Sequence, residues 1–260
     1  MRKLFFLLNT LVCCLACYGQ AFQLAPPLVT YSSVYFSGRT SVNLRFNEPG
    51  TSIHYTLNGT EPTINSPVYK GAVTIKKNTA FRARSLGNSF LPSPVVAVDF
   101  VKEGMPFREI KFTKPNEKYD AGKQNILNDT IGGIPNLNNG NWIGYNSDSV
   151  VIDISLQKTT AIKKLLIDVL QDQGSWIFLP ERIELYALNE VTKQYHLIHE
   201  KKITCDKTAT KEPVPLDMPA GRGVNAKELR LVLYPVKKIP DWHDGKGNTA
   251  WLFIDEINVY

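Results

Sequence analysis

The sequence predicts an all-β protein made of two antiparallel β-sandwich domains. Short runs in which apolar and polar residues alternate recur along the chain, as they do in half-buried strands. Turn-forming sequences such as Glu48-Pro49-Gly50 and Asn58-Gly59 separate the runs. The chain has 260 residues, of which 43% are hydrophobic and 21% charged, which fits about two globular domains and excludes a disordered or collagen-like chain.

Residues 1–19 have the pattern of a secretory signal peptide. A basic start precedes the apolar run from Leu4 to Leu15, and Cys17-Tyr18-Gly19 places small residues where a signal peptidase reads. We predict cleavage near Gly19 and a secreted, periplasmic or cell-surface location. Leu15-Ala16-Cys17 also resembles the end of a bacterial lipobox, so lipoprotein anchoring at Cys17 is the alternative. The apolar run is shorter than the roughly 20 residues that span a bilayer, so we expect no transmembrane segment.

The net charge and the number of cysteines limit which partners and which disulfides we expect. Loss of Arg2 and Lys3 with the signal lowers the formal net charge from +6 to +4, and the lysines lie in scattered pairs. We therefore expect no nucleic-acid partner. Cys205 is the one cysteine after the signal, so no intramolecular disulfide is expected.

The first domain is predicted over residues 22–101. Alternation marks strands at 42–46 and 53–57, with His54 on the outward face. Further strands are expected at 72–75, 79–85 and 95–101.

The passage from Ile53 to Ser93 contains, in order, a tight hairpin, a Glu-Pro-Thr turn, a Ser-Pro-x-Tyr segment and a strand ending in Ala-Arg-Ser. It resembles the chitobiase/β-hexosaminidase C-terminal domain, a fibronectin-III-like sandwich. The resemblance implies an accessory module without catalytic residues.

Residues 102–108 read as a linker, since Gly104 and Pro106 interrupt any periodicity. The second domain is predicted over residues 109–260. Its strands are expected at 150–154, 164–170, 183–187, 196–203, 229–234 and 251–259, with long polar loops at 125–148 and 236–249.

The stretches Asn141–Leu188 and Ile239–Tyr260, with their Trp-Ile-Phe-x-Pro and Pro-x-Trp-His-x-Gly-x-Gly phrases, resemble the discoidin, or factor 5/8 type C, galactose-binding-like domain. This resemblance implies a jelly-roll sandwich. The arrangement is similar to the C-terminal accessory region of secreted bacterial family 20 glycoside hydrolases. A glycoside hydrolase or a cell-surface protein is therefore an expected partner.

The sequence does not predict an enzyme. Family 20 hydrolases use an adjacent Asp-Glu pair on a barrel of about 250 residues, for which this chain has no room. Asp255-Glu256 is such a pair, but it lies in an alternating strand, where we expect the two side chains to point to opposite faces. The four histidines form no zinc-ligand pattern, and Cys205 has no recognisable catalytic partner.

Sugar binding needs aromatic rings for C–H faces and polar groups for hydroxyls. The loops supply candidates for this role: Trp142, Tyr145, Trp176, Trp242, His243 and Asp244. The alternative for each aromatic residue is a place in the core or a role in holding a loop, which we expect for Trp251.

The discoidin resemblance also implies a structural Ca²⁺, held by an early-loop Asp and a Glu in the last strand. Asp129 and Glu256 occupy comparable places. The usual Asp-Gly turn of that loop is Asp129-Thr130 here, and two ordinary surface carboxylates are the alternative. No other cofactor is expected.

Two functions remain open. The first is a secreted, non-catalytic carbohydrate-binding protein that recognises a galactose- or N-acetylhexosamine-type glycan, with the first domain as spacer. The second is a structural or assembly protein derived from a hexosaminidase accessory region, with no sugar affinity.

Overall fold

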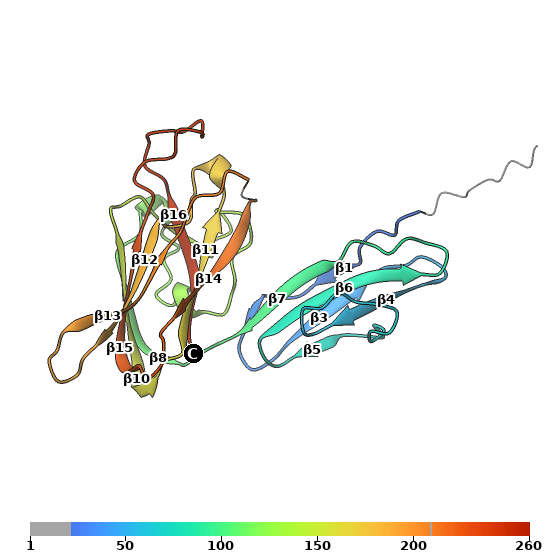
Figure 1. The fold of residues 1–260 in the computed structure, drawn as a ribbon, viewed down its shortest axis with the longest axis horizontal. Coiled ribbons are helices and arrows are strands. Elements are labelled where there is room, and N and C mark those ends of the chain that lie inside the picture. The colour runs from blue at the N-terminus through green and yellow to red at the C-terminus, as the bar shows by residue number, and fades with distance from the viewer. Residues whose placement is uncertain (1–21, 209) are drawn as a thin grey trace, which may run out of the picture.

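The computed structural model describes residues 22–208 and 210–260. The predicted signal peptide and the lipobox at Cys17 fall outside these residues. The described chain consists of strands, loops and three short 3₁₀ helices, arranged as two separate lobes (Figure 1). This confirms the all-β prediction. None of the described helices is long and apolar enough to cross a membrane.

The first lobe is a sandwich of two small sheets with strand orders β1-β3-β5 and β2-β7-β6-β4. Its strands are β1 (Leu28–Thr30), β2 (Tyr35–Phe36), β3 (Thr40–Arg45), β4 (Thr51–Thr56), β5 (Val73–Ile75), β6 (Thr79–Gly87) and β7 (Val96–Lys102). Alternating apolar residues of β3 and β6 meet between the sheets, where Val42 and Phe81 are fully buried. The alternation therefore marks the core face as predicted.

His54 corrects one expectation, because it is buried rather than outward-facing. The chain around Pro67 to Tyr69 pairs along the free edge of β4, with the Tyr69 amide donating to the Ile53 carbonyl at 2.8 Å. The two ring nitrogens of His54 lie 2.9 Å from the Ser52 hydroxyl and 2.9 Å from the Ser66 carbonyl oxygen.

The second lobe is a larger sandwich of a five-stranded sheet, β13-β12-β15-β10-β8, and a four-stranded sheet, β14-β11-β16-β9. Its elements are β8 (Phe107–Phe112), η1 (Glu117–Tyr119), η2 (Ile126–Asn128), β9 (Ile143–Tyr145), β10 (Val150–Ala161), β11 (Lys164–Gln171), η3 (Gln173–Ser175), β12 (Arg182–Leu188), β13 (Tyr195–Lys202), β14 (Glu212–Pro219), β15 (Asn225–Tyr234) and β16 (Leu252–Val259). Leu, Ile and Val side chains from both sheets fill one continuous core.

A β-bulge in β16 decides where its acidic pair points. Ile167 of β11 pairs with Ile257, whereas Val169 pairs with Ile254, so Asp168 alone faces the two residues Asp255 and Glu256. Ile254 and Ile257 both enter the core. The bulge therefore turns both acidic side chains to the outer face of the sheet, which corrects the expectation that they point to opposite faces.

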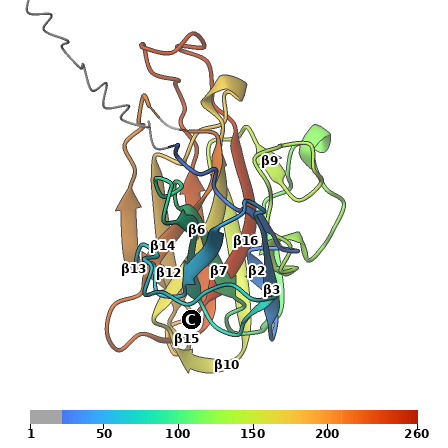
Figure 2. The same ribbon diagram turned by 90° about the vertical axis from the view of Figure 1, so that its right-hand side faces the viewer.

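The two lobes are joined by a short, hydrogen-bonded connection from Glu103 to Pro106. The Gly104 amide donates to the Asn258 side-chain oxygen at 2.9 Å, and the Met105 amide donates to the Val259 carbonyl at 2.7 Å. A second contact joins the Gly132 amide to the Ser33 hydroxyl at 3.0 Å. The first lobe therefore lies against the outer face of the sheet that contains β16 (Figures 1 and 2).

Candidate functional site

The strongest candidate site lies at the end of the second lobe away from the C-terminus, which we call the apex (Figures 1 and 2). Here η3 and the loop from Val236 to Trp251 project beyond the sheets. The Gln173 side chain donates to the Asp206 carbonyl at 2.7 Å, which ties η3 to the segment that follows β13. The apex is thus built from three chain segments held together by their own hydrogen bonds.

Trp176 is the exposed aromatic residue of the apex. Trp176 is 39% exposed, and its backbone adopts the left-handed conformation, with φ 62°. Hydrogen bonds hold that backbone in place: its amide donates to the Gln173 carbonyl at 2.8 Å, and its carbonyl accepts from the Trp251 amide at 2.8 Å. Bulky residues rarely adopt positive φ, and such strain concentrates at functional sites.

Gly245 supports the Trp176 ring at close range. A Cβ atom on Gly245 would lie 2.7 Å from Cε2 of Trp176, closer than van der Waals contact allows. The sequence Gly245-Lys246-Gly247 thus supplies more than a flexible turn, since only glycine at its first position lets the ring sit where it does.

His243 fastens the apical loop to η3. Its Nδ1 accepts from the Gly245 amide at 2.9 Å, so its Nε2 carries the proton and donates to the Gln173 carbonyl oxygen at 3.1 Å. The ring also packs edge-on against Phe178, with centroids 5.4 Å apart. The structure therefore gives His243 a positioning role beside the exposed ring.

Trp242 and Asp244, the neighbours of His243, differ in their surroundings. Trp242 is partly buried against Phe178 and Ile239, with the Lys207 ammonium 5.9 Å from its ring centre. Asp244 is exposed, and its carboxylate makes no hydrogen bond or ion pair within the described residues. Asp244 is thus an apical carboxylate that is free to accept hydrogen bonds from a ligand, as is Asp241 in the same loop.

Trp142 and Tyr145 lie inside the lobe, which corrects the prediction that they contact a ligand. Trp142 is 2% exposed, packs on Phe253 and donates from its indole nitrogen to the Ile134 carbonyl at 3.0 Å. Tyr145 is 1% exposed, and its hydroxyl donates to the Thr113 carbonyl at 2.9 Å. Both belong to or border β9, whose side chains the flanking loops cover.

Tyr119 of η1 was not among the predicted site residues. Its ring packs edge-on against Trp251 at 4.9 Å and against Phe253 at 4.8 Å. Trp251 is only partly buried, so this aromatic stack reaches the surface below Trp176. An isolated tyrosine among polar residues gave no sequence signal for this position.

Asp129 and Glu256, the predicted calcium ligands, do come together. Thr130 adopts φ 61°, so it makes the left-handed turn that glycine makes in the usual Asp-Gly sequence. Glu256 is fully buried, and neither of its carboxylate oxygens has a hydrogen-bond partner within the described residues. Burial and then the neighbouring Asp129 carboxyl raise the pKa of Glu256 to about 8.

Two further buried carboxyls lie beside Glu256. Burial, followed by the charges of Glu256 and Asp168, raises the pKa of Asp255 to about 10, and burial raises that of Asp168 to about 7. Tyr35 of the first lobe faces Asp168, and burial there raises the tyrosine pKa. No group of three or more His, Cys, Asp or Glu side chains between residues 22–208 and 210–260 is arranged to hold a metal ion. Any cation here would add backbone or water oxygens to the Asp129 and Glu256 pair.

Comparison with protein families matches part of the first lobe: residues 42–100 fit the family described as Fn3 associated. A search of the curated proteins gave no match.

Several solved structures resemble the chain over somewhat more than half its length. One is a Ruminococcus gnavus GH29 fucosidase in complex with fucose, with 16% identity and a TM-score of 0.35, covering 58% of this chain and 24% of that one. Another is CpGH89CBM32-5 from Clostridium perfringens in complex with GalNAc-β-1,3-galactose, with 15% identity, a TM-score of 0.37 and coverage of 58% and 94%. A pectin-binding carbohydrate-binding module has 13% identity, a TM-score of 0.35 and coverage of 60% and 91%. At these scores the likenesses assign neither a family nor a ligand to this chain.

Proposed function

We propose that the protein is an exported, non-catalytic carbohydrate-binding protein whose apex binds a glycan and whose first lobe is a spacer. The observation that carries the proposal is Trp176, an exposed indole ring held in a strained backbone conformation by hydrogen bonds and by contact with Gly245. An exposed indole ring on a fixed backbone suits stacking against the C–H face of a sugar, and backbone strain of this kind concentrates at functional sites.

The chemistry of the apex suits a saccharide. The ring of Trp176 offers a face to the C–H groups of a sugar, and the free carboxylate of Asp244 accepts hydrogen bonds from hydroxyl groups. His243 keeps the loop that carries Asp244 in register with Trp176. A galactose- or N-acetylhexosamine-type terminal unit is the ligand class that we propose, bound weakly because few groups converge on it.

The test is a glycan array with the wild-type protein and the Trp176→Ala variant. We expect binding to a defined terminal sugar that falls at least about tenfold in the variant, since losing a stacking contact and the buried area costs more than about 1.4 kcal/mol. Phe22→Ala is the matched control, because Phe22 is an exposed aromatic residue of the first lobe. It should leave binding unchanged.

A folded wild-type protein that binds no glycan would reject this function. The structural or assembly role would then take its place. The observation that favours that role is the exposed apolar surface of the first lobe, where Ile64 is 65% and Leu91 is 51% exposed.

We also propose a structural calcium ion held by Asp129 and Glu256. Support comes from the buried, unpartnered oxygens of Glu256 and from the oxygen-rich chemistry that calcium prefers. Calcium should raise the melting temperature of the wild-type protein, because a ligand at 100 times its Kd stabilises by about 2.7 kcal/mol. Glu256→Gln should remove that increase, whereas Glu117→Gln, at an exposed carboxyl, should keep it. An equal increase in both variants would exclude this site.

A further inference from the structure

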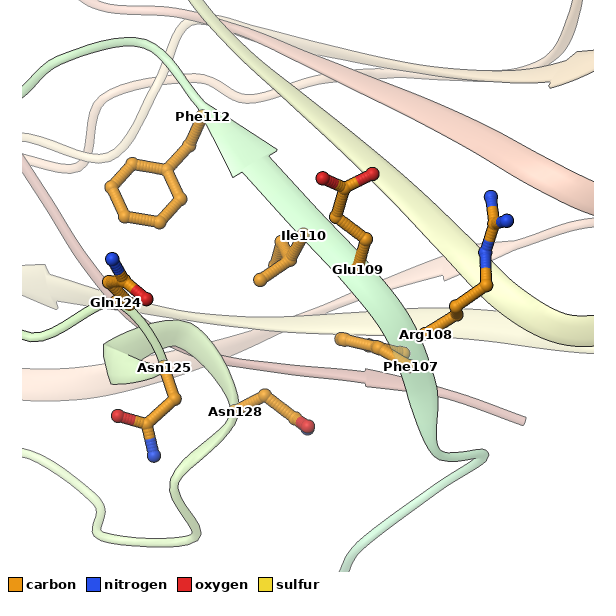
Figure 3. A pocket seen from close by; sticks show the side chains of 8 residues that line it. All are labelled: Phe107, Arg108, Glu109, Ile110, Phe112, Gln124, Asn125 and Asn128. Carbon is orange, nitrogen blue, oxygen red and sulfur yellow. The ribbon is translucent and has the colours of Figure 1, made fainter.

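A hollow lies on the flank of the second lobe, away from the apex. It has a volume of about 580 Å³, within the range of about 300–1,000 Å³ that is usual for ligand sites. Figure 3 shows it between the edge strand β8 and the segment that carries η2. Its lining residues are Phe107, Arg108, Glu109, Ile110, Phe112, Gln124, Asn125 and Asn128.

The floor of this flank groove is apolar. Phe107 pairs with Leu156 and Glu109 with Ser155, and the register shift between these pairs marks a bulge in the pairing of β8. Phe107, Ile110 and Phe112 consequently all pack on the core of the lobe and stay only partly buried. The half-exposed faces of these side chains form a surface on which sugar C–H groups can lie.

The opposite wall consists of amide side chains. Gln124 and Asn125 are exposed, and neither side chain makes a hydrogen bond within the described part of the chain. Asn128 uses its amide nitrogen in a 3.4 Å contact with the Ile257 carbonyl, which leaves its side-chain oxygen uncommitted. Primary amides donate and accept at once, as hydroxyl groups do, so this wall suits a ligand rich in hydroxyls.

The charged residues that line this hollow are already paired. Arg108 bonds to Glu228 at 3.2 Å, and Glu109 lies 3.1 Å from Lys111. A neighbouring hollow of about 390 Å³ shares Phe112 and Gln124 with the first, so the groove continues past Phe112. Among the described residues of that extension, Lys114 pairs with Glu117, whereas Asp120 and Lys123 make no ion pair. The length of the groove suits a chain of several units, and the paired charges of the first hollow suit a neutral stretch there.

We propose that the flank groove is a second saccharide site, which holds an interior stretch of a neutral oligosaccharide while the apex takes a chain end. This inference deepens the proposed carbohydrate-binding function and rests on it. Two sites on one lobe would also raise the overall affinity for a long or multivalent glycan, because the second contact forms within the complex.

The experiment uses the Trp176→Ala protein, in which the apex is disabled. Hexasaccharides of β-1,4-linked N-acetylglucosamine and of β-1,4-linked galactose are titrated while ¹H–¹⁵N spectra record the side-chain amide signals of Gln124 and Asn125. We expect these signals to shift with at least one hexasaccharide. Adding Gln124→Ala and Asn125→Ala should weaken that binding at least about fivefold, since it removes two hydrogen-bonding groups, and the side-chain amide signal of Asn128 reports the affinity in this variant.

The matched control removes the same two residue types elsewhere, as Gln194→Ala with Asn138→Ala, which are also exposed. Affinity should not change. If the Gln124 and Asn125 signals stay still while the Trp176 indole signal of the wild-type protein moves, the groove is rejected and the apex stands. If no signal moves in a folded sample with any glycan, the carbohydrate-binding function itself fails.

Discussion

The backbone of Trp176 is held in a conformation that costs free energy and that fixes the position of its ring. A non-glycine residue held at positive φ costs about 1–3 kcal/mol, and two backbone hydrogen bonds keep Trp176 there. The contact with Gly245 sets how far the ring stands out from the lobe. Affinity should therefore depend on Gly245 although glycine has no side chain to offer a ligand.

We predict that Gly245→Ala weakens glycan binding at least about tenfold while changing the melting temperature little. The added Cβ would displace the Trp176 ring, and a partly exposed ring can move without opening the core. Calorimetric titration and thermal unfolding measure the two effects. Gly174→Ala in η3 is the control, because its nearest neighbour would be 3.7 Å away. Unchanged affinity for Gly245→Ala would show that the ring does not contact the sugar.

His243 should affect binding and stability together. We predict that His243→Ala lowers the free energy of unfolding by about 1–3 kcal/mol, because the Gly245 amide and the Gln173 carbonyl lose their partner. Binding should weaken as the loop bearing Asp244 loosens. Denaturant unfolding and calorimetric titration measure both. A stable variant with full affinity would contradict the positioning role.

Trp142 and Trp176 show why the sequence alone could not separate a buried ring from an exposed one. Trp142 and Trp176 both precede apolar residues in polar loops. Each ring contacts a glycine: Gly133 of the same loop contacts Trp142, and Gly245 of a different loop contacts Trp176. Such loop contacts leave no periodic pattern in the sequence.

Among the elements, those with regular alternation could be predicted, and those shaped by edges or bulges could not. The core strands β10, β12 and β15 follow their alternation, whereas β11 is an apolar run that Asp168 interrupts and that is buried on both faces. β14 was overlooked because Pro213, Pro215 and Pro219 argue against a strand, and it is tolerated because it lies at the edge of its sheet. β8 begins inside the predicted linker for a similar reason, since no alternation survives its bulge.

Burial of Asp168 on β11 makes stability depend on pH. Its pKa is raised from an ordinary 3.8 to about 7, so above pH 4 the unfolded chain ionises while the folded one stays protonated. Asp168 should therefore contribute a fall in stability on the order of 3 kcal/mol as pH rises from about 4 to 7. Asp168→Asn should make the decline shallower in thermal unfolding measured with a chelator, and Asp255 and Glu256, whose pKa values burial also raises, should keep the rest of it. An unchanged slope would mean that Asp168 does not titrate in this range.

At the scale of the whole molecule, the connection between the lobes packs closely against the backbone of the second lobe. A Cβ on Gly104 would lie 2.2 Å from the Val259 carbonyl oxygen, in a backbone contact that cannot yield locally. We predict that Gly104→Ala separates the lobes and increases the radius of gyration in small-angle X-ray scattering, while each lobe keeps its own fold. Gly71→Ala, with nothing within 4 Å, should leave the scattering unchanged. An identical scattering profile for Gly104→Ala would show that the close packing at Gly104 is not needed to hold the lobes together.

The pairing of Met105 with Val259 places the entry and the exit of the second lobe side by side. A domain with adjacent ends can be inserted into a surface loop of another protein without pulling that host apart. Since the apex lies at the far end, such a graft would present its loops outward in any host. The second lobe is therefore suited to insertion, as an intact domain, into a surface loop of another protein.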